Sequence, residues 1–178
     1  MRLRRHPLFI IALRYGSIAG VVMVLLLIGT FYIGQHPLLI SPYFDFRIVL
    51  FGVFILFALK EFRDNINYGV LHFFQGMIGS YMLVFIAAII GSLGVLVFAA
   101  LEKNFVSSYI EAMTAYLKGF SEEDIKTIGK AVYDRNLSLL PATNSRMLAV
   151  SYFGQGILIG LFVSIVLSVI LRKQPKNQ

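Results

Sequence analysis

Three histidines and one run of three carboxylates are the side chains of this sequence best suited to catalysis or metal binding. His6, His36 and His72 are far apart in the chain, and no His-x-x-x-His or Glu-x-x-His spacing brings ligands onto one helical face. The acidic run 122–124 follows a serine, which is typical of a capped first helical turn. The chain also lacks cysteine and every glycine-rich nucleotide fingerprint. The sequence therefore predicts a protein that is not an enzyme and holds no metal or cofactor.

Polar side chains inside the apolar runs are the next candidates. Gln75, Tyr81 and Gln155 are candidate intramembrane polar residues. The two glutamines are expected at different depths, which favours separate structural hydrogen bonds over a shared substrate site. The alternative is a groove between the third and fourth spans lined by all three side chains, as a carrier of lipids would need.

A charged corner between two apolar runs is the clearest candidate surface site. Lys60, Glu61, Arg63 and Asp64 form a compact, charge-balanced group that could dock a protein partner. The alternative interpretation is that these charges only solubilise a turn.

The composition indicates a membrane protein. Hydrophobic residues make up 58% of the 178 residues, charged residues 14%, and the mean hydropathy is +0.79. Soluble domains are about half apolar and a quarter charged. We therefore expect a single all-α membrane domain, a four-helix bundle.

Four apolar runs define the predicted spans. They cover about residues 15–34, 44–60, 76–101 and 147–171. In the second run the uncharged part is short, so we expect Asp45 and Arg47 at the outer interface, where long side chains can snorkel. There they could pair with each other or with the outer segment. Residues 68–76 form either an interfacial turn, which we favour, or part of a long third helix.

Glycines spaced four apart predict close helix packing. Gly16 and Gly20 lie in the first run, and Gly156 and Gly160 in the last. We expect contacts within one chain rather than a dimer interface. Ser164 and Ser168, one turn apart, can bond to carbonyls of their own helix.

An amphipathic segment, about 102–140, separates the third and fourth spans. Residues 104–118 and 122–136 carry apolar side chains at helical spacing, so two helices are expected there. Such helices lie on the membrane, cap the bundle or bind a partner.

Charge predicts the orientation. If the charged corner and both termini share one side, that side holds nine basic and two acidic residues, whereas the other side holds seven of each. The positive-inside rule then places both termini in the cytoplasm, facing anionic lipid headgroups. No basic stripe is interleaved with stacking aromatics, which argues against nucleic-acid binding.

The corner 57–64, followed by 68–73 with its glycine and phenylalanines, resembles the signature of a bacterial family called "domain of unknown function 4199". The resemblance covers the whole chain: four spans, the Lys-x-Phe-Arg-Asp corner and the outer helical segment. It implies a location in the inner membrane of an envelope-bearing bacterium and carries no activity or catalytic residues. At Gln75 this chain has a bulkier residue than the usual pattern.

Two functions remain open from the sequence. The first is a non-catalytic subunit or scaffold of an envelope complex, docking a membrane or envelope protein. The alternative is a small carrier or flippase for a lipid or lipid-linked sugar.

Overall fold

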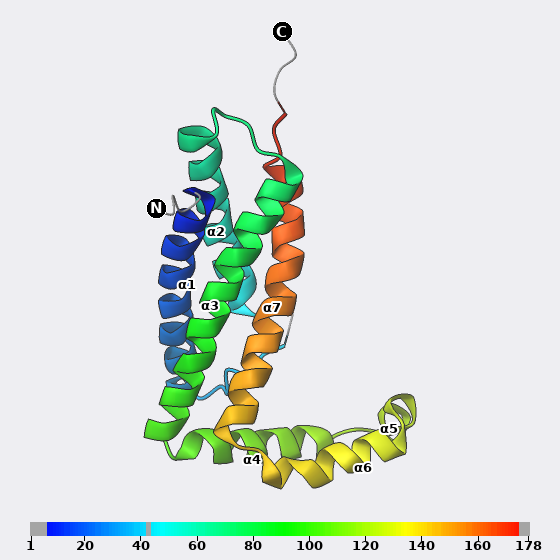
Figure 1. Ribbon diagram of the computed structural model, residues 1–178. Coiled ribbons are helices and arrows are strands. Elements are labelled where there is room, and N and C mark those ends of the chain that lie inside the picture. Colours follow the sequence, from blue (N-terminus) through cyan, green and yellow to red (C-terminus); the bar gives the residue numbers. More distant parts are fainter. Residues whose placement is uncertain (1–6, 42–43, 175–178) are drawn as a thin grey trace, which may run out of the picture.

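The computed structural model describes residues 7–41 and 44–174, and this part of the chain is all-α. Figure 1 shows long helices side by side and shorter helices lying across one end. The helices are α1 (Pro7–Tyr32), α2 (Phe46–Glu61), α3 (Phe73–Leu101), α4 (Asn104–Lys118), α5 (Glu122–Ile128), α6 (Lys130–Leu139) and α7 (Ser145–Ile170). A π-helical turn, Phe62–Ile66, follows α2, and a 3-10 turn, Leu140–Ala142, precedes α7.

Three of these helices are long and apolar enough to span a membrane. They are α1, α3 and α7, with 26, 29 and 26 residues and mean hydropathies of 2.2, 2.7 and 2.3. A span needs about 20 residues to cross a hydrocarbon core of about 30 Å. The chain is therefore a multi-pass membrane protein.

The predicted second span, 44–60, is not among these three helices. Helix α2 has 16 residues, which is about 24 Å at about 1.5 Å per residue. It begins beside Tyr152 and Gln155, well inside the length of α7, because the connection from α1 runs back along α7 before α2 starts (Figure 1). The structure thus shows three helices long enough to span a membrane and a shorter helix, α2, in place of the predicted second span.

Glycines bring the three spans into close contact. A Cβ on Gly16 would lie 2.7 Å from the main-chain oxygen of Leu83, and one on Gly160 would lie 2.2 Å from a methyl carbon of Val84. Gly20 likewise faces Ile90 of α3. The predicted packing within one chain is confirmed, and α3 lies between α1 and α7.

The serines of α7 differ from expectation. Ser164 and Ser168 are fully buried, but their hydroxyl oxygens have no hydrogen-bond partner among the described residues. The Cβ of Ser168 lies close to where Gly76 of α3 lacks a side chain. The two serines therefore act as small residues that let α3 and α7 approach.

Residues 68–72 form a turn, as favoured, and residues 73–76 belong to the third helix. Tyr68 and Gly69 have positive φ angles and turn the chain, and Leu71 pairs with Lys173 through two main-chain hydrogen bonds of 2.9 Å. Helix α3 then starts at Phe73 and continues without a break to Leu101. The helix therefore begins three residues before the predicted start of the span.

Helices α4, α5 and α6, which we call the crosswise arm, lie across the end of the bundle opposite the start of α1 (Figure 1). The predicted cap of α5 is confirmed: the Ser121 hydroxyl accepts from the Asp124 N–H, and the Asp124 carboxylate accepts from the Ser121 N–H. The single helix expected over 122–136 is wrong, because Gly129, with φ +93°, separates α5 from α6.

Candidate functional site

The site centres on a buried ion pair at the start of α2. The Arg47 Nε donates to both carboxylate oxygens of Asp45 at 2.9 Å, and Nη2 also contacts Oδ2. The side chains are only 5% and 3% exposed for Asp45 and Arg47 respectively. Asp45 Oδ1 also accepts from the main-chain N–H of Arg47 at 2.9 Å, so the same carboxylate caps α2. Two residues thus start a helix and form an ion pair inside the bundle.

Helix α7 supplies the other contacts of the guanidinium group. Arg47 Nη2 donates to Gln155 Oε1 at 2.9 Å, and Nη1 donates to the Tyr152 carbonyl at 3.3 Å. The guanidinium carbon lies 4.5 Å from the centre of the Tyr152 ring, within range of a cation–π interaction. Arg47 therefore ties α2 to the middle turns of α7.

The structure corrects the predicted position of these charges. Asp45 and Arg47 do not snorkel to an interface but point into the protein. Removing two charges from water costs several kcal/mol per ion unless they are paired and hydrogen-bonded. Ionisable residues within the membrane are rare and commonly mark binding or transport sites.

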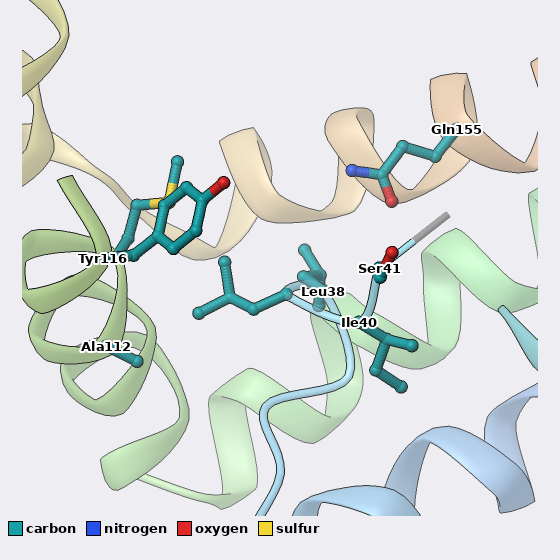
Figure 2. Close-up of a pocket in the computed structure, with 8 residues that line it drawn as sticks. Leu38, Ile40, Ser41, Ala112, Tyr116 and Gln155 are labelled. Carbon is teal, nitrogen blue, oxygen red and sulfur yellow. The ribbon is translucent and has the colours of Figure 1, made fainter. Parts of the chain in front are cut away.

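Two pockets lie beside the pair. The larger, about 530 Å³, is bounded by the connection 38–41, by Ala112, Met113 and Tyr116 of α4, and by Gln155. Figure 2 shows the Gln155 amide reaching toward Ser41 across this space, with Tyr116 on the opposite side. The smaller pocket, about 230 Å³, is lined by Ile40, Asp45, Arg47, Gln155, Leu158 and Ile159. Ile40 and Gln155 border both pockets, so the ion pair lies next to a largely apolar opening.

The three predicted intramembrane polar residues do not line one groove. Gln75 lies at the start of α3, where its Oε1 accepts from the His72 N–H at 3.1 Å and the Asn67 amide at 3.3 Å. Gln155 bonds to Arg47 instead. Tyr81 is half-buried on α3 and bonds neither to the partners of Gln75 nor to Arg47. The structural roles that we favoured fit Gln75, whereas Gln155 belongs to the ion-pair site.

The charged corner is largely engaged in contacts within the protein. Glu61 accepts hydrogen bonds from Arg14 and from the Tyr15 hydroxyl, which joins α2 to α1. Arg63 pairs with Asp64 at 2.7 Å. The Arg63 guanidinium, with Lys60 and Lys173 nearby, holds the pKa of the Asp64 carboxyl below its usual range. Lys60, Arg63 and Asp64 thus form a compact exposed patch, and Glu61 is turned toward α1.

The histidines do not converge. His36 lies at the end of α1 nearest the crosswise arm, His72 lies at the start of α3 at the opposite end, and His6 lies outside the described residues. The His36 Nε2 donates to the Phe105 carbonyl at 3.1 Å, and Nδ1 accepts from the Leu38 N–H at 3.3 Å. The Leu38 contact requires the neutral ring, because a protonated Nδ1 could not accept, whereas either form of the ring could donate to Phe105.

This environment predicts a pH dependence of stability. Burial lowers the pKa of His36 below its ordinary value of 6.5. As the pH falls below 6.5, the unfolded chain binds a proton that the folded chain resists, so the free energy of unfolding should decrease. The decrease should level off once the pH is below the folded pKa, and above the ordinary pKa His36 should contribute no slope.

Thermal unfolding in detergent between about pH 7.5 and 5, an interval that brackets the ordinary histidine pKa, would measure this effect. His36→Gln, whose amide can still donate to Phe105, should flatten the curve over that interval. An unchanged slope in His36→Gln would assign the pH dependence to other groups.

The chain matches no curated protein and no solved structure. A family model described as "Protein of unknown function (DUF4199)" matches residues 14–173. This match includes the charged corner, most of α1, all of α3 and α7, and the Asp45–Arg47 pair, and the protein belongs to that family.

Proposed function

We propose that this protein is a non-catalytic membrane protein that binds an amphiphile, a lipid or lipid-linked sugar, in the two pockets beside Asp45 and Arg47. The observation that carries the proposal is the joining of an apolar opening to a buried polar end at Gln155 and Arg47. The larger pocket falls within the range of about 300–1,000 Å³ that is typical of small-molecule sites.

Each part of an amphiphile has suitable contacts there. An acyl chain can lie along Leu38, Met113 and Leu158, the last of which is 61% exposed on the outer surface of α7. A polar headgroup can reach the Gln155 amide and Arg47, whose Nη1 makes one hydrogen bond in the described structure although it carries two N–H groups. Helices α3 and α7 approach closely at Gly76, Gly91 and Gly160, so the geometry favours binding from one side over passage between them.

A pocket-filling substitution tests this function. Ala112→Phe should fill the larger pocket and reduce the amount of co-purified amphiphile by about tenfold or more, since lost contacts of about 1.4 kcal/mol already weaken binding tenfold. Native mass spectrometry of protein extracted with host membrane lipids in mild detergent would measure occupancy. Ala115→Phe is the matched control, because Ala115 is exposed on α4 and does not line the pocket.

Two outcomes would contradict the proposal. One is a wild-type protein that carries no amphiphile above the level of bulk lipid. The other is equal occupancy in Ala112→Phe and Ala115→Phe.

We also propose that the membrane is a bacterial cytoplasmic membrane with both termini on its cytoplasmic side. The support is the excess of basic residues at the end where α1 begins and α7 ends. The crosswise arm then lies on the outer side.

A subunit or scaffold role is the second candidate function. The exposed patch of Lys60, Arg63 and Asp64 supports it, because paired charges on a rigid turn can present a defined surface. The same purification distinguishes the two functions. A stoichiometric protein that is lost in Arg63→Ala/Asp64→Ala supports the subunit role, whereas a lipid unaffected by that double variant supports the pocket.

A further inference from the structure

The crosswise arm carries apolar side chains that no described part of the protein covers. Ile128 is 43% exposed, Val132 49% and Leu139 50%. Figure 1 shows α5 and α6 extending sideways past α7. None of the three residues lines either pocket of the proposed site, and this surface therefore requires a separate explanation.

Val132 and Leu139 lie on α6, whereas Ile128 is the last residue of α5. At about 100° per residue, Val132 and Leu139 lie within about 20° of each other with Arg135 at the edge of their face, and Lys130 and Asp134 lie on nearly the opposite side. A third side faces the protein, where the Tyr133 ring lies 6.4 Å from the ring of Phe120. Helix α6 thus has one side packed toward Phe120, one charged side and one partly exposed apolar side.

The three spans fix the direction of the membrane relative to this helix. Their axes run across the bilayer, and the arm lies crosswise to them at one end of the bundle (Figure 1). A helix in that position lies parallel to the membrane surface and next to the lipid that surrounds α7. Its apolar and charged sides then match the two sides of an interface between lipid and water.

The charges of the arm indicate which kind of lipid contact this is. Residues 104–139 hold four basic and five acidic side chains. This near balance provides no general attraction to anionic headgroups, so apolar insertion must supply the binding energy. We propose that the Val132–Leu139 face of α6 is inserted at the boundary between headgroups and acyl chains of the adjacent leaflet, and that zwitterionic lipid is sufficient.

The absence of tryptophan from the chain makes a direct test possible. Val132→Trp and Asp134→Trp would each be the sole indole in the full-length protein, on opposite sides of α6. Both variants would be reconstituted in phosphatidylcholine vesicles with brominated acyl chains, with and without phosphatidylglycerol. Phe162→Trp, at a 68% exposed position on the span α7, reports that reconstitution worked.

Val132→Trp should show blue-shifted emission and several-fold stronger quenching by brominated lipid than Asp134→Trp. Asp134→Trp should instead be quenched by aqueous acrylamide, and phosphatidylglycerol should change neither result. Equal responses of the two variants to both quenchers would overturn the proposal. Protection of Val132→Trp from both quenchers would also overturn it and would indicate a protein covering this face.

Discussion

Arg47→Ala is expected to lower the free energy of unfolding by about 3–5 kcal/mol, because it breaks a buried ion pair by removing only one partner. The guanidinium group is 3% exposed and neutralises Asp45, which is 5% exposed. Truncation would leave a buried carboxylate without its counter-ion and would free the Gln155 amide and the Tyr152 carbonyl. Unfolding by SDS in mixed micelles, followed by circular dichroism, measures the change.

Asp45→Asn/Arg47→Met is the control that separates charge from packing. Asparagine retains the helix cap, methionine retains much of the apolar stem, and no charge remains buried. This double variant should unfold within about 1 kcal/mol of wild type. A small loss in Arg47→Ala, comparable to that of the double variant, would contradict the assignment of a buried ion pair that depends on both partners.

Gly16→Ala should lower the free energy of unfolding by about 1–3 kcal/mol, because an added methyl group overpacks the contact between α1 and α3. Its Cβ would lie 2.7 Å from the Leu83 carbonyl oxygen, and main-chain atoms cannot rotate away as a side chain can. The same detergent titration measures the loss.

Gly29→Ala, the same substitution elsewhere in α1, is the matched control for Gly16→Ala. Nothing lies within 4 Å of a Cβ at Gly29. Alanine is a better helix former than glycine by about 1 kcal/mol in a helix interior, so this variant should be neutral or slightly stabilising. If both variants behaved alike, the close approach of α1 to α3 would be incorrect.

The spans could be predicted because each is a single long apolar run, and hydropathy alone identifies α1, α3 and α7. Helix α2 was harder to predict. The 12 uncharged residues 48–59 are too few for a span, so the predicted span was extended to include Asp45. The break at Gly129 was also missed. Glycine is tolerated inside helices, so its presence does not by itself reveal a positive φ.

The site could be predicted only in part. Gln155 was identified as a polar residue in an apolar run, and Asp45 and Arg47 were recognised as charges beside a short run. The pairing of Asp45 with Arg47 is local and could be anticipated. The contact of Arg47 with Gln155 depends on the connection after α1, whose residues 38–41 lie beside Gln155, and no local pattern encodes that path. The useful signal was the shortness of the uncharged run, which could have indicated that α2 starts within the bundle.

Native mass spectrometry of Asp45→Asn/Arg47→Met beside wild type tests whether the buried pair and its pockets bind an amphiphile. Both preparations must first be shown to unfold with similar free energies. We expect bound amphiphile on wild type and its loss from the double variant, because the polar end of the pocket has lost its cation. Equal amphiphile occupancy on the two proteins would overturn this proposal and leave the pair with a structural role.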